Sequence, residues 1–157
     1  MRTTCCCMRP VLRRRPEPVS TVILDNEAVQ ALADPSHRKH RRVLAIIEAV
    51  TTRARRGSVG AGELIIPTAV QVEAGWDRRN PATAALNRLR AYRPPLDGVA
   101  ADRAAAVVAA LGVSVADAHI AEVLISHHGP HTVLTSDPDD LRRIIAHAGA
   151  PARVVIT

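Results

Sequence analysis

A chain of 157 residues with 47% hydrophobic content is long enough to bury one continuous core, so a single compact domain is expected. Aromatic residues make up only 1% of the chain, which argues against single-strand binders of the RRM or OB type, because those bind bases on aromatic rings. The net charge is +6, but residues 1–18 hold five Arg and one Glu. Only +2 is left for residues 19–157, so any nucleic-acid contact must come from a local patch.

Residues 1–18 are predicted to be a disordered basic leader, because they combine three Pro and clustered Arg without apolar periodicity. A mis-assigned start codon would equally explain this segment. The three Cys of the chain are consecutive within it, and adjacent Cys cannot easily bridge one another, so no disulfide framework is expected. There is no secretory signal and no apolar stretch near the roughly 20 residues that span a bilayer, which favours a cytoplasmic protein.

From residue 19 onward, short apolar runs alternate with longer amphipathic stretches. Asn80-Pro81 is a typical helix start, and Ser114 is expected to cap a later helix. Pro94-Pro95 limits a weak strand there to a sheet edge. The predicted elements are strand 21–24, helix 26–33, a helix with its apolar side at 43–50 that ends at the glycine-rich 57–62, strand 63–66, helix 68–76, helix 80–90, strand 92–96, helices 99–111 and 115–127, strand 131–135, helix 138–148 and strand 153–156.

This alternation of strands and helices implies a mostly parallel central sheet with helices on both faces, which is a three-layer α/β/α sandwich over residues 19–157. In such sheets, ligands bind beyond the carboxyl ends of the strands. Residues at that edge are therefore the first candidates for a functional site.

Four acidic residues fall at or near this edge. Asp25 directly follows the first predicted strand, and Asp137 lies two residues beyond the strand at 131–135. Glu73 lies in the helix after the second strand, and Asp117 lies in the first turn of a later helix. The topology can thus bring together four carboxylates that are far apart in the sequence.

A cluster of unpaired carboxylates is unfavourable, because like charges a few ångströms apart raise one another's pKa. A hard divalent cation such as Mg²⁺ or Mn²⁺ reverses that cost, since it prefers oxygen ligands and is often held by a few carboxylates and a substrate phosphate. Such an ion activates water for attack on phosphorus and offsets the charge of the transition state. No Cys or Lys nucleophile is then required.

Each acid also has a simpler structural interpretation. Asp25 can be only a helix N-cap, and Asp117 and Asp137 can be favoured by the dipole at a helix N-terminus. Glu73 is the informative acid, because it interrupts a stretch of small and apolar residues, where a surface helix would carry more charge. The functional interpretation therefore depends on the set of four and on the topology.

The four acids lie within four motifs: VILDNEAV at 22–29, IPTAVQVEAGW at 66–76, SVADAHIAEVL at 114–124 and VLTSDPDDLRRI at 133–144. In this order the motifs resemble those of the PIN-domain family, and within it the VapC-like ribonuclease toxins of bacterial toxin-antitoxin modules. The resemblance covers residues 20–157 and implies a PIN-like α/β/α fold.

The resemblance also implies that the four acids bind metal and act in catalysis: Asp25, Glu73, Asp117 and Asp137, with Asp140 as an additional or alternative ligand. Thr135 and Ser136 resemble the family's polar positions beside the metal. Many members have Thr or Ser close after the first aspartate, whereas here Asn26-Glu27 follow, and the Arg-rich leader is also atypical. Neither departure affects the four acids.

The family implies an endoribonuclease that uses Mg²⁺ or Mn²⁺ to cleave RNA, forms a homodimer and is silenced by a small antitoxin protein. An open reading frame for a short partner directly upstream would support the toxin interpretation, and its absence would favour a solitary nuclease. Two basic groups are candidate RNA contacts, although they could equally be solvated helix faces: Arg38, Lys39, Arg41 and Arg42, and the pair Arg78 and Arg79.

Two other classes of protein share features of this sequence. A catalytically weak PIN-like domain could serve as a scaffold or an RNA-binding module, but none of the four acids is missing. A flavodoxin-like or receiver domain shares the doubly wound layout. The chain lacks the Gly-rich phosphate loop and the Lys at the end of a late strand that these domains use.

The histidines offer little potential for metal binding. His37 and His40 are one helical turn apart. A second group of three lies in a polar turn without an acidic or thiol companion nearby: His127, His128 and His131. His119 lies two residues from Asp117, too close in a helix to share its face, so no chemistry is assigned to it.

Overall fold

The computed structural model describes residues 21–55 and 62–157 of the chain. The predicted leader over 1–18 and most of the glycine-rich break at 57–62 lie outside the described residues. The boundary between leader and domain stays a prediction.

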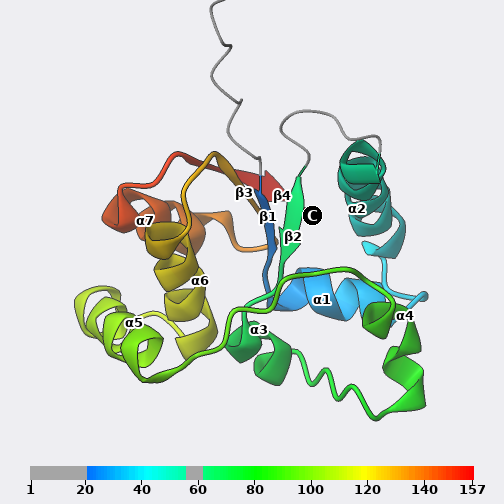
Figure 1. The fold of residues 1–157 in the computed structure, drawn as a ribbon, viewed down its shortest axis with the longest axis horizontal. Coiled ribbons are helices and arrows are strands. Elements are labelled where there is room, and N and C mark those ends of the chain that lie inside the picture. The colour runs from blue at the N-terminus through cyan, green and yellow to red at the C-terminus, as the bar shows by residue number, and fades with distance from the viewer. Residues whose placement is uncertain (1–20, 56–61) are drawn as a thin grey trace, which may run out of the picture.

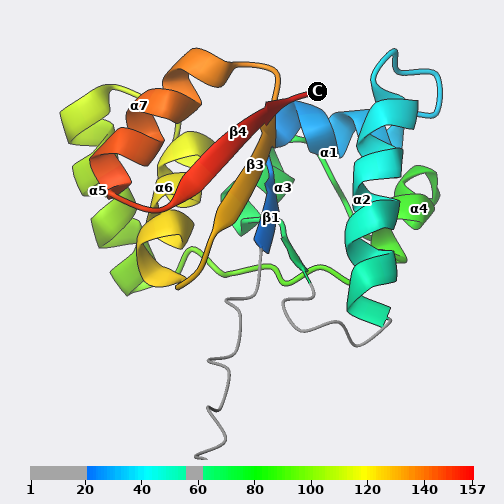
Figure 2. The same ribbon diagram turned by 90° about the horizontal axis from the view of Figure 1, so that it is seen from above.

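A four-stranded sheet forms the centre of the fold, and all its strands run parallel in the order β2-β1-β3-β4 (Figure 1, Figure 2). The central strands β1 (Thr21–Leu24) and β3 (His131–Thr135) are buried at every residue. This burial on both faces fits the apolar run at the end of β1, whereas β3 also buries polar side chains: His131, Thr132 and Thr135. The edge strands are β2 (Glu63–Ile65) and β4 (Ala152–Ile156).

The register of the two central strands fixes where the chain leaves the sheet. Leu24 is paired with Leu134, and the backbone N–H of Asp25 donates to the carbonyl of Leu134 at 3.1 Å. Asp25 therefore emerges beside Thr135, the last residue of β3, at the carboxyl edge of the sheet.

Helices cover both faces of the sheet (Figure 2). On one side lie α1 (Asn26–Ala33), α2 (His40–Arg55) and the short α4 (Ala84–Asn87), and on the other lie α5 (Gly98–Leu111), α6 (Val115–Ser126) and α7 (Pro138–Ala148). The predicted three-layer α/β/α sandwich with a parallel sheet is confirmed. Within the described ranges no single helix is long and apolar enough to cross a membrane, and α5 with α6, bent by 115°, passes that test only as a pair.

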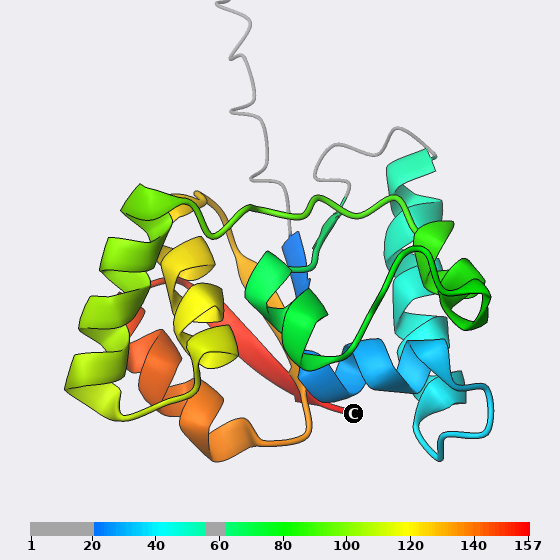
Figure 3. The ribbon, with the colours of Figure 1, turned by 90° about the horizontal axis from the view of Figure 1, so that it is seen from below.

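The helix α3 (Thr68–Glu73) lies between α6 and α1, where the two helical layers approach each other below the sheet edge (Figure 3). The prediction extended this helix to residue 76. The helix ends earlier because Gly75 takes a left-handed conformation with φ of 65°, which most other residues adopt only with strain. Glu73 is consequently the last residue of α3.

The region between α3 and α5 is less regular than predicted. Asn80 caps a helix as expected, with its side chain accepting from the backbone N–H of Ala82, but only the 3-10 turn Pro81–Thr83 and the four residues of α4 follow. The predicted strand at 92–96 is wrong. Tyr92 forms an isolated parallel bridge with Ile65, and Pro94 and Pro95 have no N–H with which to continue the ladder.

Candidate active site

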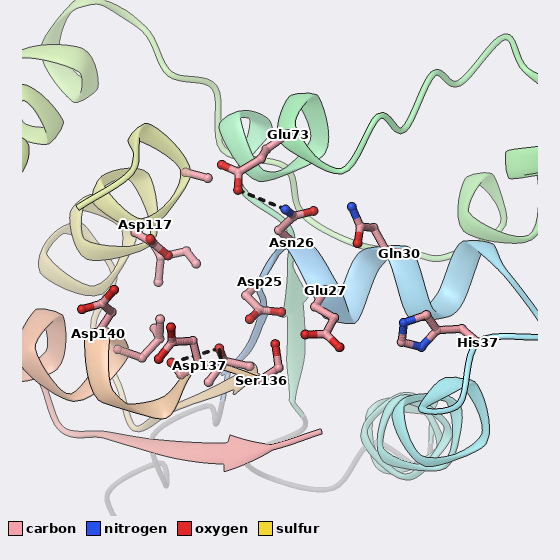
Figure 4. Close-up of a pocket in the computed structure, with 14 residues that line it drawn as sticks. Asp25, Asn26, Glu27, Gln30, His37, Glu73, Asp117, Ser136, Asp137 and Asp140 are labelled. Carbon is pink, nitrogen blue, oxygen red and sulfur yellow. Dashed lines mark hydrogen bonds between the residues drawn. The ribbon is translucent and has the colours of Figure 1, made fainter.

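A cavity of about 350 Å³ lies at the carboxyl edge of the sheet, and the four predicted acids and Asp140 all line it (Figure 4). The acids come from separate parts of the fold: the end of β1, the end of α3, the first turn of α6, and the start of α7. The cavity therefore joins residues spread over most of the chain. Its acidic lining residues are Asp25, Glu27, Glu73, Asp117, Asp137 and Asp140.

Asp25 is both a helix cap and a cavity residue. Its Oδ1 accepts from the backbone N–H of Ala28 at 2.9 Å, which caps α1. The side chain is buried, and this burial raises the pKa of Asp25 above 3.8 despite hydrogen bonds from Thr135, Ala28 and Ser136 that lower it. A carboxylate in this position would be stabilised by a nearby cation.

Asp117 is tied to the residue that caps its helix. Ser114 Oγ accepts from the backbone N–H of Asp117 at 3.1 Å and donates to its Oδ2 at 2.9 Å, so the predicted cap is confirmed. Burial is the main reason that the pKa of Asp117 is raised, and repulsion from Glu73 and Asp140 adds to it. The acids are thus near enough to act on one another electrostatically.

Glu73 is held by a residue that the sequence analysis did not include in the site. Asn26 Nδ2 donates to Glu73 Oε1 at 3.0 Å and so connects the start of α1 to the end of α3. Asn26 also lines the cavity, and its Oδ1 is buried without a hydrogen-bond partner in the described ranges. Only its position directly after Asp25 could have indicated this role.

The two candidates for the fourth acid have different surroundings. Asp137 caps α7, with Oδ1 accepting from the backbone N–H of Asp139 at 3.3 Å, and its own N–H donates to Thr135 Oγ1 at 2.9 Å. Asp140 pairs with Arg143 at 2.9 Å. Both acids line the cavity, but the charge of Asp140 is already partly offset by an arginine.

The lining fits a hydrated divalent cation in its chemistry. Its carboxylates, together with the unpartnered Asn26 oxygen, are the hard oxygen donors that Mg²⁺ prefers. Within the described residues, however, no three His, Cys, Asp or Glu side chains stand close enough to form a ready-made metal site. Mg²⁺ usually keeps several waters and is bound through one or two carboxylates, so some of these acids would contact it through water.

The cavity continues along α1, away from the acids, to Gln30 and His37 (Figure 4). His37 Nδ1 accepts from the backbone N–H of Lys39 at 3.2 Å, which leaves Nε2 to carry the ring proton. Lys39 Nζ in turn pairs with Glu27 at 2.5 Å, so the charge of Glu27 is offset inside the cavity wall. This arm of the cavity therefore offers the hydrogen-bonding groups of Gln30 and His37, and its carboxylate, Glu27, is paired.

The basic residues predicted to contact RNA differ in their exposure and in their distance from the acidic cavity. Lys39 is only 13% exposed in its side chain and is paired, whereas Arg38, Arg41 and Arg42 are exposed. Neither Arg78 nor Arg79 lines the acidic cavity. Arg78 lines a separate cavity of about 950 Å³ between α2, β2 and the segment after α4.

Two other histidines, His131 and His40, are used in local structure. His131 is buried at the amino end of β3, where Nδ1 is hydrogen-bonded to the Thr21 hydroxyl and Nε2 to the carbonyl of His127. His40 Nδ1 is hydrogen-bonded to the carbonyl of Ala31 at 2.8 Å. Neither group of histidines forms a metal site within the described ranges.

The fold is similar to that of a chain in the VapBC2 complex from Rickettsia felis. That crystal structure contains VapBC2 bound to a DNA fragment from its promoter; the match has a TM-score of 0.55 and 11% sequence identity, and it covers 87% of this chain and 98% of the other. At this identity the similarity concerns the fold. No protein-family model matches the sequence, and no curated protein matches it either.

Proposed function

We propose that this protein is a metal-dependent endoribonuclease that hydrolyses RNA phosphodiester bonds and serves as the toxin of a type II toxin-antitoxin module. The observation that carries the proposal is the meeting of Asp25, Glu73, Asp117 and Asp137 at one cavity on the carboxyl edge of a parallel sheet. The similarity of the fold to a chain of a VapBC2 complex supports the same class.

The carboxylates named above, with Asp140, would hold Mg²⁺ or Mn²⁺. The bound ion would supply a Lewis acid that polarises the phosphate and offsets developing negative charge. The chain's own contribution is to gather the acids. Burial raises the pKa values of Asp25 and Asp117, so a bound cation would stabilise their charged forms. Cation binding is therefore expected to release protons from these groups.

The arm of the cavity along α1 is proposed to hold the RNA next to the scissile phosphate. Gln30 and the Nε2–H of His37 can donate hydrogen bonds to phosphate or base oxygens. Exposed Arg38, Arg41 and Arg42 lie just beyond His37 in the chain and would add sequence-independent attraction for the RNA backbone.

Cleavage of total RNA by the purified chain tests the proposal. We expect Mg²⁺- or Mn²⁺-dependent cleavage that EDTA abolishes, and a loss of at least about 100-fold in Asp25→Asn and Asp117→Asn, because several kcal/mol of charge stabilisation depends on the ion. Asp139→Asn is the matched control, since Asp139 lies between Asp137 and Asp140, is exposed and pairs with Arg142 outside the cavity. Equal activity in all three variants would contradict the assignment.

A catalytically weak RNA-binding domain is the second candidate, because the described acids do not form a compact ligand group. If the protein is such a domain, it should bind RNA in the presence of EDTA and should not cleave RNA in Mg²⁺ or Mn²⁺. A solitary nuclease outside a toxin module would instead cleave RNA but have no partner. Co-purification with the product of an adjacent short reading frame, and inhibition of cleavage by it, would separate the toxin from the solitary enzyme.

The location of the protein in the cell and its oligomeric state are also part of the proposal. A toxin of this class would act in the cytoplasm, where its RNA lies, and would form a homodimer. Light scattering of the purified chain would measure the mass of the particle in solution.

A further inference from the structure

His119 is buried in the middle of α6, yet its ring is bonded to the backbone of another helix. The N–H of Ala69, in the first turn of α3, donates to His119 Nδ1 at 3.3 Å. The first N–H groups of a helix have no partner within the helix, and Pro67 before α3 provides no side-chain cap. His119 therefore satisfies a helix terminus that the local sequence leaves open.

The same ring has an unfavourable feature. When Nδ1 accepts a hydrogen bond, the neutral ring carries its proton on Nε2. His119 Nε2 is buried and has no partner in the described ranges, so an N–H group is removed from water without compensation. A leucine of similar size would avoid this penalty but would lose the bond to Ala69.

The bond joins the two helices that carry neighbouring acids of the cavity. Glu73 is one helical turn beyond Ala69 at the end of α3, and Asp117 is in the first turn of α6, just before His119. In the described ranges no other side-chain hydrogen bond links these helices. A helix of six residues has little stability of its own, so its position depends on such contacts.

Other contacts hold α3 to different neighbours. The Thr68 hydroxyl accepts from the backbone N–H of Leu96 at 3.0 Å, and Gln71 accepts from Arg93 at 3.3 Å. Neither of these two hydrogen bonds joins α3 to α6. The bond from Ala69 to His119 joins these two helices directly.

We propose that His119 is a positioning residue that fixes α3 against α6 and thereby sets where Glu73 stands relative to Asp117. The proposal rests on the proposed nuclease function, in which these two acids share a cation. It assigns a role to a buried histidine that contacts neither the cavity nor a substrate.

The test compares His119→Leu, which removes the acceptor, with His119→Asn, whose Oδ1 can take the place of Nδ1. Calorimetric titration of the metal-free chain with Mn²⁺ measures cation affinity without reference to activity. We expect Kd to rise about 10-fold or more in His119→Leu, as is usual when a residue that supports metal ligands is lost, and to recover largely in His119→Asn. The Mg²⁺ concentration for half-maximal cleavage should follow Kd, while KM for RNA changes little.

Two further variants make the comparison decisive. His119→Gln places its oxygen near the position of Nε2 rather than Nδ1, so it should not restore affinity, even if His119→Leu fails to fold. His131→Leu removes another buried histidine at the opposite end of the sheet and should leave the Mn²⁺ affinity unchanged. The proposal would be overturned if the folded His119 variants bound Mn²⁺ with the Kd of the wild type. Equal Mn²⁺ affinity in His119→Asn and His119→Gln would also overturn it. Wild-type chain that binds Mn²⁺ without cleaving RNA would contradict the nuclease but leave the positioning role measurable.

Discussion

At the scale of single residues, three carboxylates of the cavity also have a local structural role at a helix N-terminus. Asp25 caps α1, Asp117 is bonded to Ser114, and Asp137 caps α7. The two interpretations suggested by the sequence are therefore compatible, because a carboxylate has two oxygens and can bond to a helix terminus while it faces a cavity. Cap propensity alone could not separate a structural acid from a functional one.

The pH dependence of stability follows from two of these acids. The pKa values of Asp25 and Asp117 lie above 3.8, so the folded, metal-free chain holds their protons more tightly than the unfolded chain. Their contribution to stability is complete below pH 3.8 and is lost as the pH rises through the raised values. A double variant, Asp25→Asn with Asp117→Asn, stays neutral and keeps the cap. We expect it to match the wild type near pH 3.8 and to be more stable at pH 7.

Urea denaturation in EDTA across this pH range measures the difference in the free energy of unfolding between the two chains. Asp97→Asn is a suitable comparison, because Asp97 caps α5 in an exposed position away from the cavity. A difference that stays constant with pH would show that the two carboxyls do not titrate as argued.

At the scale of elements, the sequence predicted best where burial is uniform. Strands β1 and β3 and helices α1 and α7 have the predicted bounds, because the apolar residues within the strands and the helical periodicity with clear caps leave little choice. The region after α3 was predicted less well. Gly75 ends α3 early, and the segment at 92–96 pairs with β2 at only one bridge.

The ion pair between Lys39, in the loop before α2, and Glu27, in α1, can be tested by substitution. Replacing Lys39 by Met leaves Glu27 unpaired and partly buried beside Asp25, so we expect a loss of about 1 to 3 kcal/mol in the free energy of unfolding. Arg41→Met removes an exposed positive charge nearby and should change stability by less than about 0.5 kcal/mol.

We expect the effect on RNA binding to come from Arg41→Met rather than from Lys39→Met. Arg41→Met should raise KM for RNA and reduce its dependence on salt, because an exposed arginine attracts the phosphate backbone. Thermal melting and cleavage assays at two salt concentrations measure both effects. If Lys39→Met weakened RNA binding without destabilising the fold, Lys39 would be an RNA contact, as the sequence analysis proposed.

At the scale of the whole molecule, stability and cation binding should be linked. A cation that binds only the folded chain stabilises it by about 2.7 kcal/mol at a concentration 100 times Kd. We expect Mg²⁺ to raise the melting temperature of the wild type, and to do so more at pH 8 than at pH 5, because binding displaces protons from Asp25 and Asp117. Calorimetric melting with and without Mg²⁺ measures the shift.

The same melting experiment has an internal control. Asp139→Asn should show the wild-type shift, and Asp117→Asn should show a much smaller one. A shift of equal size in both variants would place the cation elsewhere on the protein.

Outside residues 80–96, the sequence by itself determined the succession of strands and helices along the chain. It also singled out four acids at or near the ends of elements, because both depend on local burial and local caps. It also restricted the site to the carboxyl edge, since parallel strands end on one side. Tertiary structure decided which polar neighbours hold those acids. Asn26 meets Glu73, and His119 meets Ala69, only after the helices have packed. Such contacts between helices depend on packing distances and angles, which no pattern within one element records.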